Sequence, residues 1–141
     1  MYSKPLVTDR ERGYDESQVL ESITDRRGII LDVNDAFCQV SGYSRAELLG
    51  QNHHIVRHPD MPDVAFEDLW KTLQEGATWR GIVKNRCKNG DYYWVDETIT
   101  PQYEDGEVIA YRARQIKPSR RQIDLACGLY RHLQQHPLHH S

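Results

Sequence analysis

Polar and ionisable side chains are concentrated in one short segment near the middle of the chain. Residues 52–62 read NHHIVRHPDMP and hold three histidines, an arginine and an aspartate, with apolar stretches on both sides. The segment is too polar for a core, yet its neighbours are apolar enough to belong to one. We expect it to line a ligand cavity, to form a metal site, or to be a polar surface loop.

Arg57 is the candidate of this segment for binding an anion. A guanidinium group donates charge-assisted, bidentate hydrogen bonds that suit a pyrophosphate. The alternative is a surface ion pair with Asp60 or Asp63. Asp60 is itself a candidate to accept hydrogen bonds from a ribose or to hold Arg57, and its alternative role is a cap at the start of the next helix.

His53, His54 and His58 suggest a metal or haem site, since neutral imidazole is a ligand for both. However, no cysteine or carboxylate spacing in the sequence completes a recognisable metal site. We therefore favour His58 as a residue that orders the turn or donates a hydrogen bond to a bound cofactor.

A second candidate group lies on a predicted strand that starts at Trp79. Alternation along this strand puts Trp79, Gly81, Val83 and Asn85 on one face. This face combines a large aromatic ring, a glycine that leaves space beside the strand, and an amide at the end of the strand. The amide has one acceptor and two donors, which match the polar edge of a flat heterocycle. The alternative for Asn85 is a hydrogen bond to the backbone near a turn.

The composition argues against several classes of function. A chain of 141 residues suits one domain, and its formal net charge of -3, with both signs mixed along the chain, does not predict a nucleic-acid-binding face. Its apolar runs are far shorter than the ~20 residues of a membrane span, and its start lacks a signal-peptide core. Three widely spaced cysteines favour a reducing compartment, so we expect a cytoplasmic location.

Catalytic signatures are missing from the sequence. It holds no nucleophile and base in a recognisable order, no paired carboxylates, no Walker loop and no G-x-G-x-x-G. We therefore do not expect an enzyme.

The elements that must position the candidate residues are predicted from periodicity and turn chemistry. We predict a hairpin over residues 19–24 and 28–33, short helices within 34–50, a longer helix ended by Gly76, strands over 79–87, 92–101 and 108–117, and a last helix around 123–133. Trp70 lies on one face of the longer helix with Phe66, Leu69 and Leu73, where either core packing or a cavity wall explains it. This order of elements predicts an α+β fold.

Several segments together resemble the PAS family: 34–37 (NDAF), 41–43 (SGY), 47–50 (ELLG) and 88–94 (KNGDYYW). The resemblance covers about residues 19–117. It implies a five-stranded antiparallel sheet whose short helices and one longer helix form a cofactor cavity. On this basis we divide the chain into an N-terminal arm (1–18), a PAS sensor domain (19–117), and a C-terminal helix with a frayed tail (118–141).

More specific segments resemble the FAD-binding PAS domain of bacterial aerotaxis receptors. These are 56–62 (VRHPDMP), 79–81 (WRG) and 83–86 (VKNR), together with Phe66, Leu69 and Trp70. The resemblance implies a redox sensor that binds FAD non-covalently and signals to a receptor module of the HAMP or methyl-accepting type, with another PAS copy as a further partner. The cofactor-binding residues it implies are His53, Arg57, His58, Asp60, Trp70, Trp79, Asn85 and Arg112.

The chain is also similar to the flavin-binding light sensors of the same superfamily. Their photoreactive cysteine is replaced by His53 in the turn 50–54 (GQNHH), so adduct photochemistry is not expected. Asn85 matches a flavin-facing asparagine, Val95 replaces the next one, and Arg112 aligns with a glutamine near the reactive edge of the flavin. The alternative for Arg112 is a solvated surface shared with Arg114.

Two other functions stay open at this point. One is a cofactor-free PAS interaction module that dimerises through its terminal helices. The other is a haem-based gas sensor.

Overall fold

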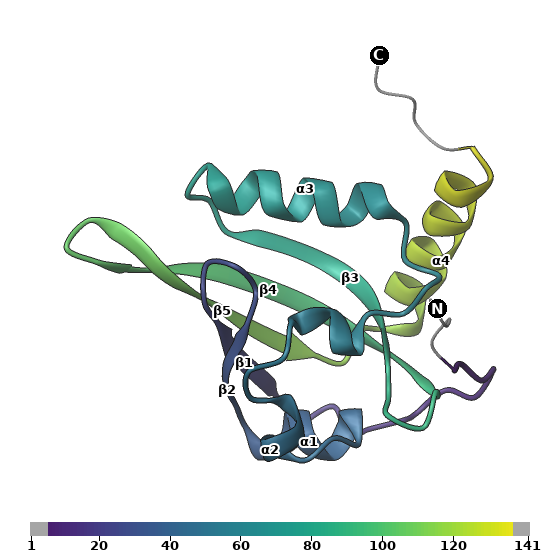
Figure 1. Cartoon of the computed structure of the whole chain (residues 1–141). Helices are drawn as coiled ribbons and strands as arrows, with labels where there is room; N and C mark the ends of the chain where they lie inside the picture. Colours follow the sequence, from purple (N-terminus) through teal and green to yellow (C-terminus); the bar gives the residue numbers. More distant parts are fainter. Residues whose placement is uncertain (1–5, 137–141) are drawn as a thin grey trace, which may run out of the picture.

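An antiparallel sheet of five strands, in the order β2-β1-β5-β4-β3, forms the frame of the molecule (Figure 1). The structure is a computed structural model that describes residues 6–136. The strands are β1 (Leu20–Thr24), β2 (Ile30–Val33), β3 (Trp79–Arg86), β4 (Tyr92–Glu104) and β5 (Glu107–Ile116). The predicted α+β fold with a five-stranded antiparallel sheet is confirmed.

The helices are α1 (Asp35–Ser41), α2 (Arg45–Leu48), the 3-10 helix η1 (His53–Val56), α3 (Asp63–Gln74) and α4 (Arg120–Gln135). Sequence periodicity predicted all of them except η1, which is a single short turn inside the polar segment. The tail after residue 136, which was expected to be frayed, lies outside the described residues. In the described part of the chain, no helix combines the length and the apolar composition that crossing a membrane requires.

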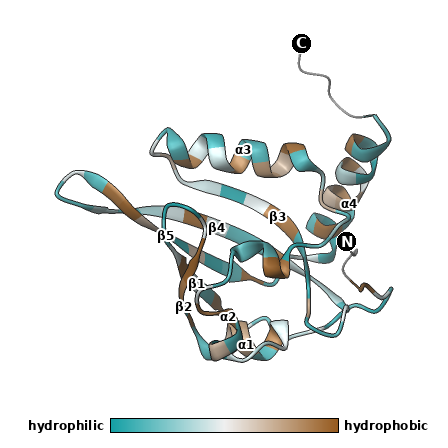
Figure 2. Ribbon diagram, in the orientation of Figure 1, coloured by the Kyte–Doolittle hydropathy of each residue, from teal (hydrophilic) through white to brown (hydrophobic). Residues whose placement is uncertain are grey.

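Strand alternation divides the core between the two faces of the sheet. On β4, Tyr93, Val95 and Ile99 pack in one cluster with apolar side chains of α1, α2, η1 and α3. Trp94 belongs to a second cluster, in which it packs against Ile123, Ala126 and other residues of α4. The segment between β2 and β3, which contains α1, α2, η1 and α3, therefore covers one face of the sheet, and α4 packs on the other face. Figure 2 shows the mixed apolar and polar composition of α3 and α4 that suits helices packed on one side only.

The N-terminal segment is docked against the start of β4 over part of its length. Thr8 N donates to the carbonyl of Gly90 at 2.9 Å, and Arg12 N donates to the carbonyl of Tyr92 at 2.6 Å. Tyr14 adds a hydrogen bond to the Trp94 carbonyl. The described part of the predicted N-terminal arm is therefore docked on the sheet.

Asn34 begins α1 and ties it to β1. Its Oδ1 accepts from the backbone N–H of Phe37 at 3.0 Å and of Glu21 at 3.1 Å, and its Nδ2 donates to the Val19 carbonyl at 2.8 Å. We expect Asn34→Ala to lower the free energy of unfolding by about 2 kcal/mol in urea denaturation, because it removes a cap and two further bonds. Ser44→Ala, which removes only the cap of exposed α2, should cost about 0.5 to 1 kcal/mol. Equal losses would contradict the tie to β1.

Candidate functional site: a cavity between the longer helix and the sheet

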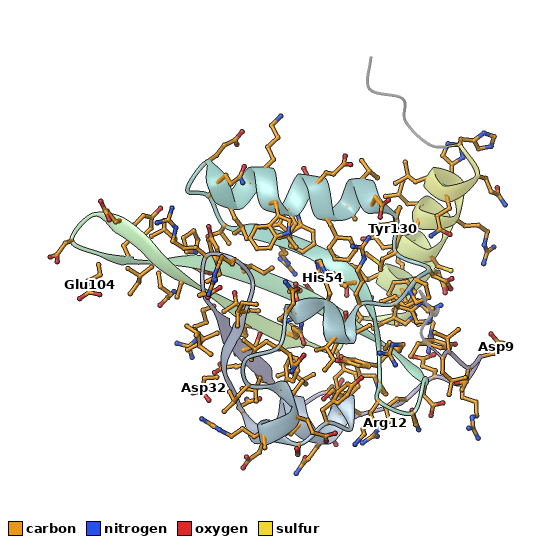
Figure 3. All side chains as sticks on the ribbon, in the orientation of Figure 1. Asp9, Arg12, Asp32, His54, Glu104 and Tyr130 are labelled. Atoms are coloured by element: carbon orange, nitrogen blue, oxygen red, sulfur yellow. The ribbon has the colours of Figure 1, made fainter. Side chains whose placement is uncertain are left out.

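A cavity lies between α3, η1 and the inner face of β3, β4 and β5, in the region labelled with His54 in Figure 3. Its apolar lining comes from Val56, Phe66, Leu69, Trp70, Leu73, Val83, Ile99, Tyr111 and Ala113. Its polar lining comes from Thr24, Asn52, His53, His54, Arg57, Asn85 and Glu97. A mostly apolar pocket with a few convergent polar groups is the usual form of a site for a small organic ligand.

The apolar face of α3 forms one wall of the cavity. Trp70 meets the Tyr111 ring edge to face, with ring centroids 5.9 Å apart. The hairpin turn also lies near the indole, since a Cβ at Gly28 would be in ordinary van der Waals contact with it at 3.5 Å. Gly28 also adopts a φ of 87°, which favours glycine. Trp70 is therefore both core and cavity wall.

Asn85 presents an unsatisfied amide in the opposite wall. Its side chain is 4% exposed, and Nδ2 has no hydrogen-bond partner. Burial raises the pKa of the nearby Tyr93 hydroxyl and the Asn85 amide opposes part of that rise, yet no hydrogen bond of good geometry joins the two. Buried polar groups are normally paired, so this donor indicates a place for a ligand atom or an ordered water.

Arg57 lies at the more exposed side of the cavity. Its Nη2 donates to Asp63 Oδ1 at 2.6 Å, and its guanidinium carbon lies 3.8 Å from the centre of the Phe66 ring. The Asp63 side chain is 90% exposed, so solvent screens the ion pair and makes it weak. The alternative predicted for Arg57, an ion pair with Asp63, is thus present. Because this ion pair is weak, Arg57 is still able to bind an anionic ligand in the cavity.

The histidines of the polar segment do not gather around one point. His53 lines the cavity, where its Nε2 is 3.3 Å from Ser22 Oγ, and burial lowers its pKa to about 4. His58 is buried, and its Nδ1 accepts from the Asp60 N–H at 3.0 Å. Burial, with Lys84 nearby, lowers the pKa of His58 to about 4 as well. Across residues 6–136, no three His, Cys, Asp or Glu side chains cluster as metal ligands would.

Comparison with known proteins now adds to this geometry. The family model of the PAS fold matches residues 30–113, which is more than half of the chain. This chain belongs to the PAS family. Its first 29 residues, which include β1, and its helix α4 fall outside the matched range.

Among curated proteins, this PAS domain is similar to the aerotaxis receptor of Escherichia coli (strain K12), with 44% identity over 94% of the chain and 26% of the receptor. It is similar to the nitrogen fixation regulatory protein of Klebsiella pneumoniae at 35% identity, over 86% of the chain and 24% of that protein. The chain thus spans about a quarter of the length of these relatives.

Solved structures show the same fold. A light-oxygen-voltage domain studied with a flavin analogue aligns with a TM-score of 0.70 and 24% identity, covering 84% of this chain and 89% of that one. The light-state LOV domain of the blue-light photoreceptor Aureochrome1 aligns with a TM-score of 0.70 and 20% identity, covering 84% and 93%.

Four of the eight predicted site residues line the cavity of the PAS domain: His53, Arg57, Trp70 and Asn85. His58 does not line it and instead orders the turn, which is one of the two roles predicted for it. Asp60 does not line it either. The Asp60 side chain is 62% exposed and binds Lys84 Nζ at 2.8 Å, and the N-cap residue of α3 is Pro62, with no side-chain cap.

Trp79 lies on the predicted face of β3, but it does not line the cavity. Its indole packs over Gly81, where a Cβ would lie 2.5 Å from the ring, and its Nε1 donates to Asp68 Oδ2 at 2.9 Å. The gap that Gly81 leaves, which we expected a cofactor to use, is therefore filled by the side chain two residues earlier.

Of the two orientations considered for Arg112, the structure has the outward one, so Arg112 does not line the cavity. Its side chain is 50% exposed, and Nη2 pairs with Glu21 Oε2 at 2.9 Å on the outer face of the sheet. The inward positions of β5 are the buried Tyr111, Ala113 and Gln115. The alternative, a solvated surface, describes Arg112 as it is placed.

Sequence reasoning missed Glu97. This residue lines the cavity, is 5% exposed, and accepts a hydrogen bond from Gln115 Nε2. Burial raises the pKa of Glu97 to about 7, and the bond from Gln115 opposes part of that rise. The available signal was alternation on β4, because Tyr93 and Val95 point inward and Glu97 shares their phase.

Proposed function

We propose that this PAS domain binds FAD non-covalently and reports the redox state of the flavin to a signalling module. The observation that carries the proposal is the buried, unpartnered Asn85 amide in the wall of an apolar cavity, with Arg57 at its more exposed side. The name of the Escherichia coli relative, an aerotaxis receptor, supports a role in sensing.

The chemistry of the cavity lining suits this cofactor. The apolar lining of α3 and the sheet would bury a flat aromatic ring and exclude water from it. Asn85 would hydrogen-bond the polar edge of the ring, and Arg57 would bind phosphate. His53, with its lowered pKa, is neutral at pH 7 and adds no charge to the pocket. The bound flavin supplies reversible electron transfer.

Helix α4 and the polar segment provide a route by which the cavity would affect the rest of a longer protein. Gln134 Nε2 donates to the backbone carbonyl of Asp60 at 2.7 Å, three residues after Arg57. Tyr130 stacks on Trp94 with ring centroids 6.5 Å apart, and its hydroxyl donates to the Ile82 carbonyl. A shift of the turn at Asp60 or of β3 would therefore change the position of α4.

The signalling partner belongs to the proposal too. The curated relatives are about four times as long as this chain, which supports a downstream receptor domain of the HAMP or methyl-accepting type, with another PAS copy as a further partner. The three cysteines are all unpaired, which supports a cytoplasmic location for the sensor.

The absorption spectrum of the purified protein tests the proposal. We expect the structured visible band of an oxidised flavin, and mass spectrometry of the released cofactor should identify FAD. A Soret band would show a haem sensor instead. If no flavin is retained even after refolding with FAD, the chain is a cofactor-free interaction module.

We expect Asn85→Leu to separate stability from cofactor binding. The ligand-free variant should be at least as stable as the wild type, with a gain of up to about 1 kcal/mol, because an unpaired buried amide is replaced by an apolar group of similar size. Flavin affinity should fall in fluorescence titration. An equal flavin affinity would return Asn85 to a purely structural role, and a large loss of stability in urea would show that its amide is paired in the folded protein.

A further inference from the structure

Glu97 is an acidic side chain buried in the wall of the cavity without a compensating cation. The Glu97 carboxyl group accepts a hydrogen bond from Gln115, which is neutral. Within the described residues, Glu97 takes part in no ion pair. The residue opposite it on β3 is Gly81, which offers no polar side chain. A buried carboxylate normally needs a cation or several donors, so this environment favours the neutral acid.

The other titratable groups that line the cavity or lie beside Glu97 are His53, His54, Arg57, Tyr93 and Tyr111. Burial lowers the pKa of both His53 and His54, so neither supplies a positive charge at pH 7. Arg57 is paired with Asp63 at the exposed side. Burial raises the pKa of Tyr93, and Glu97 adds to that rise. Glu97 is therefore the group of this pocket whose charge changes near neutral pH.

We propose that Glu97 is the proton-binding group of the cavity, and that it takes up a proton from solvent when an aromatic ring fills the pocket. A ring displaces water from the wall, which disfavours the carboxylate further and favours the carboxylic acid. The proton forms an O–H bond on Glu97, and no other bond changes. The coupling to a flavin ring rests on the proposed function, whereas the proton-binding group itself does not.

The ligand-free protein tests the first half of the inference. Carbon-13 NMR of the glutamate carboxyl groups should show that Glu97 titrates near pH 7. Since its folded pKa is raised, the folded state binds more protons, and stability falls as pH rises from about 4.5 to about 7 and then levels off. Glu97→Gln should remove this loss, so the stability difference between variant and wild type should grow across that window. A Glu97 that is fully ionised at about pH 5 would overturn the inference.

Ligand binding tests the second half. Titrations with FAD, and with lumiflavin, which has the ring but no phosphate, should give affinities that fall as pH rises above about 7, by up to tenfold per pH unit. Calorimetry in buffers of different ionisation enthalpy should show proton uptake. Glu97→Gln should bind with an affinity that is flat above about pH 7. Protonation of the histidines would instead weaken binding on the acid side, because burial favours their neutral form.

Asp96→Asn is the matched control. Asp96 precedes Glu97 on β4, is 5% exposed and points to the other face, where it pairs with Arg80 at 2.7 Å. The control should keep the pH dependence of the wild type, and a control that loses it would overturn the assignment to Glu97. If the wild type binds FAD equally well at every pH, the inference fails and the proposed function stands. If neither flavin binds, the proposed function fails with the coupled uptake, and the titration of ligand-free Glu97 still decides the proton-binding group.

Discussion

Trp79→Ala is expected to lower the free energy of unfolding by about 3 to 5 kcal/mol, measured by urea denaturation. The side chain is 7% exposed, its ring packs over Gly81, and its Nε1 is held by Asp68. Truncation would leave a void beside β3 and would remove the hydrogen-bond donor of the Asp68 carboxylate. Trp79→Phe should cost less, because it keeps most of the packing and loses only the hydrogen bond of about 1 kcal/mol.

Gly81→Ala is the complementary change. A Cβ at this position would lie 2.5 Å from the indole, so we expect overpacking that costs about 1 to 3 kcal/mol. In the Trp79→Ala background the same change should cost much less, because the ring is gone. A double-mutant cycle without coupling would show that the two residues do not share this space.

Arg57→Ala is expected to weaken FAD binding by about 1.5 to 3 kcal/mol, or roughly 10-fold to 150-fold, since it removes a charge-assisted hydrogen bond to phosphate. Binding of riboflavin, which has no phosphate, should change little. Fluorescence titration with both ligands measures the difference. In the wild type, Arg57 already packs on Phe66, so binding a phosphate costs less side-chain conformational entropy than it would for a free arginine.

Asp63→Ala is the control for this experiment. It breaks the ion pair at 2.6 Å and leaves Arg57 in place, so FAD should bind at least as well as to the wild type. If Arg57→Ala weakens FAD and riboflavin equally, Arg57 acts by packing on Phe66 and does not bind phosphate.

The order and type of the elements follow from local chemistry in the sequence. The spacing of Phe66, Leu69, Trp70 and Leu73 predicts α3 because one helical face must be apolar to be buried. Ser44 and Glu47 form a capping box at the start of α2, and this pattern is visible in the sequence. Turn residues such as Gly28 locate the hairpins, since few other residues adopt a positive φ. These signals act within a few residues, so they can be read without knowing the fold.

Which polar residues meet the cavity was decided by the tertiary structure. Asp60 has the same local chemistry whether it faces a ligand or Lys84, and only the tertiary structure places its carboxylate beside Lys84 and its carbonyl beside Gln134 of α4. The sequence left the orientation of Arg112 open, because a strand has period two and a change of phase by one residue turns every side chain to the other face. The correct phase, with Gln115 beside Glu97, follows from the pairing of β5 with β4.

The sequence by itself determined the order and type of the elements, because amphipathic periodicity records which faces are buried, and its resemblance to the PAS family indicated the cavity and four of its lining residues. The tertiary structure alone decided that Trp79 fills the space at Gly81, that Arg112 lies outside, and that Glu97 is enclosed without a cation. Those outcomes depend on strand register and on side chains that are distant in the chain, and a charge becomes costly only when packing removes its water.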